Sequence, residues 1–318
     1  KLLLLHLLLA MFLGAQTVKA DVVLNATNFP DPNFRSYISG LTGVSDGSTI
    51  SNSKLANVKT IMVDHKGIIS LKGIEYFTEL TDLCCEFNQL TSLDVSKNTK
   101  LTILWCHTNR LSSLDVSKNT KLTGLWCSEN QLSSLDVSKN TKLTSLVCDG
   151  NQLTSLDVSN NTELTNLDCR GNHLTRLVVS NNTKLKELRC ASNNIGYLYL
   201  SKNTELEFLN CSFNKIDQLN LSNNTKLTGL YCDDNRLTNL KLDDNTALTN
   251  SDIVNVGSQS STRRFTVNSY GSDTNNCWTL YVGTAGASRI RNLKIDDVSK
   301  TPKTNASGWL VVSDDLKK

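Results

Sequence analysis

Residues 101–121 read LTILWCHTNRLSSLDVSKNTK, and the middle of the chain repeats this pattern. A cysteine recurs every 21 residues, an asparagine follows it three residues later, and a second asparagine recurs at the same interval. Eight copies fill residues 80–247, and a degenerate copy precedes them from Val58 to Leu71. The cysteine column contains Cys85, Cys106, Cys127, Cys148, Cys169, Cys190, Cys211 and Cys232. Self-similarity at this period predicts a solenoid.

Each repeat contains two stretches that alternate with a period of two residues. In Leu-x-Cys, Leu104 and Cys106 should point inward and Trp105 outward, and Leu-Asp-Val repeats this alternation on the opposite side of the coil. Stacked coils then share one Leu-lined core, and each asparagine amide can bond backbone groups of its own and neighbouring turns. We therefore predict a mainly β solenoid of about nine coils, with two short strand-like segments per coil and little helix.

The flanking segments differ from the repeats. Residues 1–20 hold an apolar run too short for a comfortable membrane span, which favours a cleaved signal peptide over a membrane anchor. Residues 21–57 predict a small α-helical N-terminal cap, with Asp31 before the helix and Pro32 at its first position. The predicted solenoid covers residues 58–247. Residues 248–318 predict a β-rich C-terminal cap or the start of a β domain, with strands near 265–267, 278–282, 293–295 and 309–312.

Over residues 58–247 the repeat resembles the 21-residue IRREKO type of bacterial leucine-rich repeat, in its cysteine-containing variant. Residues 28–38 (NFPDPNFRSYI) and 73–77 (GIEYF) resemble the N-terminal cap of secreted bacterial leucine-rich repeat proteins, including internalin-like ones. This resemblance implies a secreted or surface-attached binding protein.

The chain has ten cysteines, a number that in an exported protein ordinarily suggests disulfides. In-register parallel strands, however, point neighbouring cysteines the same way, which suits the disulfide torsion poorly. We expect the column to be small buried core residues, with disulfides and metal binding as the alternatives. Cys84 and Cys277 fall outside the column. Cys84 should be exposed or covered by the N-terminal cap, and strand geometry separates it from His107, so we expect no Cys–His nucleophile.

The outward positions around Leu-x-Cys vary although the core positions hardly change. They carry two groups of candidate ligand-binding residues, which are Ile103, Trp105, His107 and Trp126, and then Phe208, Phe213 and Tyr231. Exposed aromatic groups often mark binding sites because they supply large contact areas. The alternative is that these rings only stabilise the sheet or lie beneath a cap. Between the groups lies a mixed-charge patch of Asp168, Arg170, Glu187 and Arg189.

The outward face of Leu-Asp-Val is more uniform. Four aspartates recur there, followed by Val178 and Tyr199, which could form a smaller second contact surface. The aspartates are Asp94, Asp115, Asp136 and Asp157. We interpret them as a solvated face rather than a cation site, with nearby lysines offsetting their repulsion. The segment Asp46-Gly47-Ser48 lacks the alternating acids of a calcium loop.

Composition excludes several functions. The net charge of +3 argues against a nucleic-acid partner, and a hydrophobic content of 39% excludes a multi-span membrane protein. No phosphate loop, nucleophile elbow or metalloprotease motif occurs, so we expect neither an enzyme nor a cofactor or metal. The sequence favours an exported bacterial module, secreted or at the cell surface, that recognises a protein or surface glycan through its Leu-x-Cys face, in adhesion or a host or cell-surface interaction. The alternative is a spacer that displays another domain.

Overall fold

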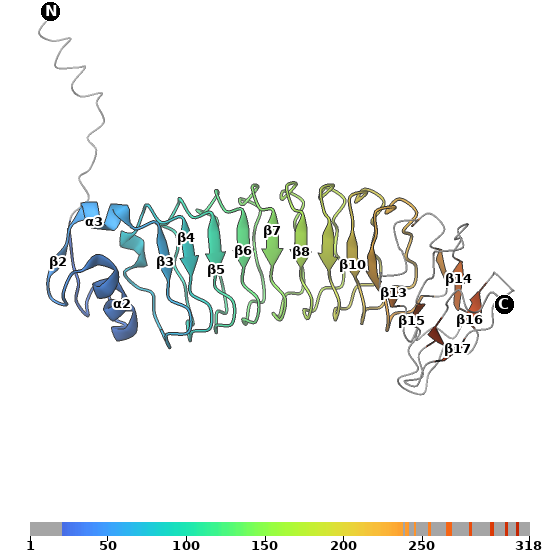
Figure 1. Ribbon diagram of the computed structural model, residues 1–318, viewed down its shortest axis with the longest axis horizontal. Helices are drawn as coiled ribbons and strands as arrows, with labels where there is room; N and C mark the ends of the chain where they lie inside the picture. Colours follow the sequence, from blue (N-terminus) through green and yellow to red (C-terminus); the bar gives the residue numbers. More distant parts are fainter. Residues whose placement is uncertain are drawn as a thin grey trace, which may run out of the picture.

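The computed structural model describes residues 21–237, 239–241 and 245, and the backbone of six short strands between residues 254 and 311. The described chain is an elongated solenoid in which one strand per coil joins a single parallel sheet (Figure 1). This sheet has 11 strands in the order β15-β13-β11-β10-β9-β8-β7-β6-β5-β4-β3. Their bounds are β3 Thr60–Met62, β4 Asp82–Cys84, β5 Ile103–Trp105, β6 Gly124–Trp126, β7 Ser145–Val147, β8 Asn166–Asp168, β9 Glu187–Arg189, β10 Phe208–Asn210, β11 Gly229–Tyr231, β13 Val254–Asn255 and β15 Leu280–Tyr281.

The register of this sheet follows the sequence repeat. Leu104 pairs with Leu125, and Trp105 with Trp126, so equivalent positions of successive coils stack directly. The leucines of both alternating stretches and the cysteine column form one continuous buried core. The predicted leucine-rich repeat solenoid is confirmed. The Leu-Asp-Val side is less regular than predicted, since along most of the solenoid it forms only isolated bridges such as Asp94 with Asp115.

Asparagine side chains satisfy the backbone where each coil turns, as predicted. The Asn172 amide nitrogen donates to the carbonyls of Cys148, Cys169 and Arg170 at 3.1, 3.1 and 3.2 Å, while its oxygen accepts from the Leu153 amide at 2.9 Å. The second asparagine of each repeat is fully buried, and its amide nitrogen donates to two carbonyls of the preceding coil, as Asn161 does to Val137 and Asn140 at 3.0 and 2.9 Å. These bonds supply partners for polar backbone groups that would otherwise be buried without any.

The cysteine column forms part of the buried core. All eight of its side chains are fully buried. Within the described residues, Cys84, Cys85 and the column members up to Cys211 are free thiols. Burial raises the pKa of Cys127 and Cys211 to about 12, so these thiols stay protonated at neutral pH. Packing of small, weakly polar side chains accounts for the repeat of cysteine at this position.

The N-terminal segment packs helices onto the first coils. It contains β1 Val22–Val23 and β2 Thr49–Ile50, which pair antiparallel, together with α2 Pro32–Thr42 and α3 Asn52–Asn57. Asp31 caps α2 by accepting from the amides of Asn33 and Phe34, and its other oxygen accepts from the Ile69 amide at 2.7 Å. One buried carboxylate thus both starts the helix and ties it to the solenoid, which confirms the predicted helical cap.

Gly73 packs closely against Phe29 where the N-terminal segment meets the first coils. Gly73 has φ +107° and precedes the short 3-10 helix η1 Ile74–Tyr76. A Cβ atom there would lie 2.2 Å from Cδ1 of the Phe29 ring and 2.9 Å from the Asn28 carbonyl oxygen. Only glycine allows the buried Phe29 side chain to sit this close to the backbone.

The parallel sheet continues beyond residue 247. Leu230 pairs with Val254, which lies more than one 21-residue period further on. A second parallel sheet joins β12 Asn239–Lys241, β14 Phe265–Asn268 and β16 Leu293–Ile295, while β17 Lys303–Thr304 pairs antiparallel with β18 Leu310–Val311. The predicted C-terminal strands therefore occur. Residues 1–20 and Cys277 lie outside the described residues, and no described helix has the length and apolar character needed to cross a bilayer.

Candidate functional site

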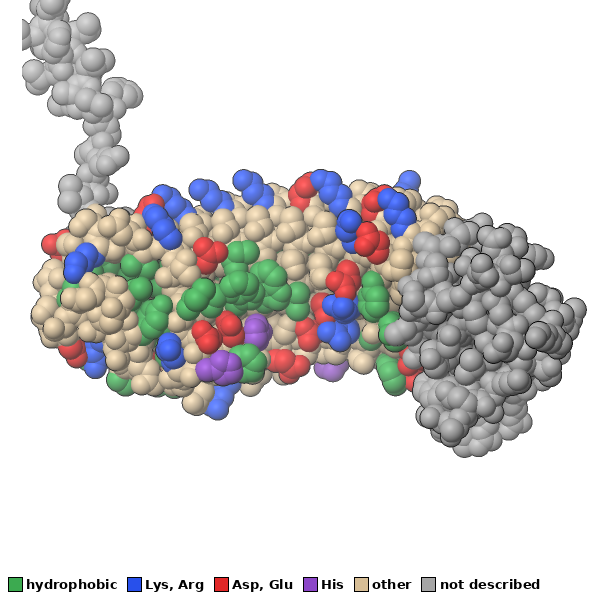
Figure 2. All heavy atoms as spheres, viewed as in Figure 1, with side chains coloured by type: hydrophobic (Ala, Val, Ile, Leu, Met, Phe, Trp, Pro, Cys, Tyr) green, Lys and Arg blue, Asp and Glu red, His purple; other side chains and the backbone are tan. Residues whose placement is uncertain are grey.

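The first aromatic group forms a continuous patch on the outward face of β5 and β6. We call Ile103, Trp105 and Trp126 the tryptophan patch. The two indole rings lie with centroids 5.3 Å apart and planes tilted by 43°, and all three side chains are partly exposed. Figure 2 shows apolar side chains gathered over these strands in the middle of the visible face. The alternating pattern thus predicts the position of this patch correctly.

Gly124 shapes the tryptophan patch. A Cβ atom at this position would lie 2.3 Å from Cζ3 of Trp126 and 3.1 Å from Cδ1 of Ile103. The Trp126 ring therefore folds over the strand into the space that a side chain would fill. This arrangement leaves the rings half-buried rather than fully exposed, so they lie against the sheet instead of projecting into solvent.

His107 belongs to a separate row of rings. His65 stacks on Phe87 with ring centroids 4.1 Å apart, and His107 and Phe87 are nearly perpendicular with ring centroids 5.2 Å apart. Phe87 and His65 have positive φ values, since they lie at the turn two positions after the column residue, and this is why their rings project there. These two residues were not among those predicted from the outward columns. Both residues lie two positions after the last inward residue of the Leu-x-Cys stretch, and this shared position is the sequence feature that could have identified them.

Cys84 is buried rather than exposed, with only 4% of the residue's surface accessible. It pairs in register with Met62 on β3 and Trp105 on β5. Burial raises the pKa of Cys84 to about 12, and the carboxylates of Glu86, Asp64 and Asp82 add to this effect. A thiol that holds its proton so firmly is a poor nucleophile. Among the described residues, no group of three or more histidine, cysteine or acidic side chains is placed to hold a metal ion.

The second aromatic group comprises a pair of tilted rings and the lining of a groove. Phe208 and Tyr231 contact each other with centroids 5.6 Å apart, and Phe208 covers Gly229 much as Trp126 covers Gly124. Exposed Phe213 joins Tyr231 in lining an open groove of about 410 Å³. Asp233 also lines it and accepts a hydrogen bond from Ser212, yet burial raises the pKa of Asp233. The three predicted residues therefore lie together.

The charges between the two aromatic groups are paired with one another. The Arg170 guanidinium donates to both oxygens of the buried Asp168, with Nη2 to Oδ2 at 2.6 Å, and this contact raises the pKa of Arg170. Glu187 forms an ion pair with Arg189. The Arg189 guanidinium in turn lies 5.1 Å from the centroid of Phe208. These pairs leave little uncompensated charge between the two groups.

The aspartates on the opposite side have a structural role. Each accepts a hydrogen bond from the amide of the serine two residues later, at 2.8–2.9 Å. These backbone bonds, followed by bonds from the serine hydroxyls, lower the pKa of all four carboxyls. The side chains are exposed and hold local turns, which agrees with a solvated face.

Comparisons with known proteins agree with this architecture. The chain is 38% identical to Internalin J of Listeria monocytogenes serotype 4b (strain F2365) over 71 residues, which is 22% of this chain and 8% of that protein. The solved functional domain of InlJ from Listeria monocytogenes, which includes a cysteine ladder, shows 34% identity and a TM-score of 0.68, covering 89% of this chain and 65% of that one. No family model matches the chain.

A more distant structure shares the fold. Internalin C2 of Listeria monocytogenes strain 4b F2365 is 24% identical, with a TM-score of 0.62, and the match covers 67% of this chain and 97% of that one. The chain thus spans only part of the length of the InlJ proteins that it matches.

Proposed function

Since the chain is an internalin-like leucine-rich repeat protein with cysteine-containing repeats, we propose that it is a binding module that recognises a protein or surface glycan through the outward face of its Leu-x-Cys strands. The observation that carries this proposal is the tryptophan patch. Two partly exposed indole rings and Ile103 form one apolar surface on adjacent coils of an otherwise repetitive scaffold. Tryptophan is enriched among residues that dominate binding energy.

Several features of the face support binding over catalysis. The Cys84 thiol is buried and protonated, and His107 contacts Phe87 and the Thr108 hydroxyl. The charged residues between the aromatic groups pair with each other. A ligand that covers this face would therefore meet two apolar areas separated by compensated charge, a surface suited to shape and stacking contacts rather than to proton transfer.

We further propose that the protein is exported from a bacterial cell and acts in the medium or at the cell surface. Residues 1–20 would serve as a Sec-type signal peptide, because their apolar run has the length of a signal-peptide core. The partner would then be extracellular, in adhesion or in contact with another cell.

An array screen of residues 21–318 against glycans and extracellular proteins tests the proposal. We expect at least one ligand to be retained by the wild-type chain and lost by Val147→Arg, because Val147 lies on β7 in register between Trp126 and Asp168. The matched control, Asp115→Asn on the opposite side, keeps an acceptor for the Ser117 amide and should bind normally. A ligand bound equally by both variants would place recognition elsewhere.

A structural spacer is the second candidate. The uniform aspartate turns favour it, since a solenoid that only separates two domains needs a regular, soluble surface and no ligand. Failure of the array screen, together with a further domain encoded after residue 318, would support this alternative.

A further inference from the structure

The Leu-Asp-Val side changes abruptly in two adjacent coils. Over four coils its two outward columns hold only serine and aspartate, namely Ser92, Ser113, Ser134 and Ser155, with Asp94, Asp115, Asp136 and Asp157. In the next coil the same positions carry Arg176 and Val178, and in the one after it Tyr197 and Tyr199. We call Val178, Tyr197 and Tyr199 the tyrosine platform. Both columns change together, and the coil after the platform carries Gln218 and Asn220 at these positions.

This change removes a stabilising turn. Aspartate at this position accepts a hydrogen bond from the serine amide two residues on, and Asn220 does the same for Ser222 at 3.0 Å. Valine and tyrosine side chains cannot accept this bond. The two coils thus give up a local interaction that their neighbours keep, and they expose apolar surface instead. A local rule broken without structural compensation often marks a functional position.

The platform is open to solvent. Val178, Tyr197 and Tyr199 are 45%, 57% and 76% exposed, so Tyr199 is the most exposed of the large hydrophobic residues in the described part of the chain. Packing within the solenoid accounts for little of their surface. Stabilisation of the fold therefore explains these side chains poorly.

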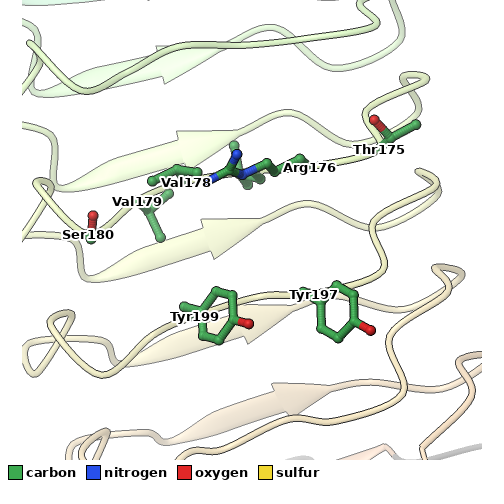
Figure 3. A pocket seen from close by; sticks show the side chains of 8 residues that line it. Thr175, Arg176, Val178, Val179, Ser180, Tyr197 and Tyr199 are labelled. Carbon is green, nitrogen blue, oxygen red and sulfur yellow. The ribbon is translucent and has the colours of Figure 1, made fainter.

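The two phenol rings form a flat surface. Their planes differ by only 9° and their centroids lie 6.5 Å apart, whereas the Trp105–Trp126 and Phe208–Tyr231 pairs are tilted by 43° and 47°. Tyr197 and Tyr199 are two residues apart in an extended segment, which directs both side chains to one side. Figure 3 shows the rings side by side with their faces turned toward the viewer.

Polar groups surround the rings. A pocket of about 360 Å³ is lined by the platform together with Thr175, Arg176 and Ser180, and no acidic residue lines this described pocket. In Figure 3 the Arg176 side chain extends along its coil toward Val178, which brings its donors near the apolar surface. Ligand pockets of this size combine aromatic walls with a few polar groups that set orientation.

We propose that the tyrosine platform is a second ligand site, separate from the Leu-x-Cys face, that binds an extended oligosaccharide. A pyranose ring with equatorial substituents presents C–H bonds on its flat faces and hydroxyls at its edge. Two coplanar phenol rings match two successive sugar rings, while Arg176, Thr175 and Ser180 can bond the hydroxyls. The rings form a flat wall of the pocket, and Thr175, Arg176 and Ser180 beside them are polar, so a sugar fits better than an apolar peptide.

Titration calorimetry of the whole chain with cellohexaose and N-acetylchitohexaose tests this site. We expect at least one hexasaccharide to bind the wild type. Tyr199→Asp restores the residue of the preceding coils and with it the turn, so this variant should keep or raise the melting temperature while losing affinity by about tenfold or more. Tyr199→Phe keeps the ring and should bind like the wild type.

Trp105→Ala/Trp126→Ala shows whether a hexasaccharide binds the other face instead. Asp157→Asn, on the same side as the platform, keeps an acceptor for the Ser159 amide and is the matched control that should bind sugar like the wild type. The proposal is wrong if neither sugar binds, if Tyr199→Asp binds unchanged, or if only the tryptophan variant loses affinity. It is also wrong if Tyr199→Asp abolishes a concentration-dependent dimer of the wild type without affecting sugar binding, since the platform would then be a contact between two copies of the chain.

Discussion

Asn172→Ala is expected to lower the free energy of unfolding by about 2–6 kcal/mol. The wild-type amide donates to three carbonyls and accepts from the Leu153 amide, all near the core. Alanine would leave the Leu153 amide and the Cys148 carbonyl buried without this partner. The cost of each unsatisfied group is about 1–3 kcal/mol, which makes this a large effect for the loss of one polar side chain.

Urea denaturation followed by circular dichroism measures this loss. Asn181→Ala is the matched control in the next turn of the same coil, because Asn181 is exposed and makes one bond, to the Ser159 carbonyl at 3.2 Å. It should change stability by less than about 1 kcal/mol. Asn172→Asp should lower the free energy of unfolding more than Asn172→Ala does, since a carboxylate cannot donate to the three carbonyls. Equal stability of Asn172→Ala and Asn181→Ala would contradict the assigned role of the asparagine column.

Trp105→Ala/Trp126→Ala is expected to weaken binding of the ligand found in the array screen by about 100-fold or more, because central tryptophans commonly contribute about 2 kcal/mol or more each. Stability should change little. The rings are partly exposed on the outward face, and losing their mutual contact should cost only about 0.5–1.5 kcal/mol. Surface plasmon resonance with the retained ligand, and thermal unfolding of the same samples, separate the two effects.

Two further variants show which part of the face matters. Gly124→Ser keeps both tryptophans but displaces the Trp126 ring, so it should also weaken binding. Phe208→Ala removes the centre of the second aromatic group and tests whether the ligand reaches across the paired charges. If the double tryptophan variant binds as well as the wild type, the tryptophan patch is not the binding site.

Most of the fold could be predicted from the sequence because each coil repeats the same residues in the same chemical roles. Leu104, Cys106 and Asn109 each define a column, and the parallel register carries this pattern from coil to coil. The Asp31–Pro32 helix start depends only on local bonding and was predicted as well. The three-residue Leu-x-Cys strands follow directly from the alternation.

Features that depend on neighbouring coils were harder to predict. Whether an outward residue is exposed depends on the side chains before and after it, which is why Cys84 between Met62 and Trp105 is buried. The Trp126 ring can fold over the strand because Gly124 has no side chain to fill that space. The partners of His107 depend on the positive-φ turn that directs Phe87 toward it. Tyr197 was not predicted, because its column holds serine in four coils, arginine in the coil before it and glutamine in the coil after it, so no pattern points to an aromatic residue there.

The cysteine column marks inward positions of the coils from which both proposed sites project, so its chemical state tests the architecture behind both sites. The direct measurement is a thiol titration of the denatured, unreduced protein, with alkylation and mass spectrometry to identify each reactive cysteine. A packed column of free thiols predicts eight or more reactive cysteines among the ten in the chain. Two or fewer reactive thiols, with disulfides between cysteines of neighbouring coils, would contradict it.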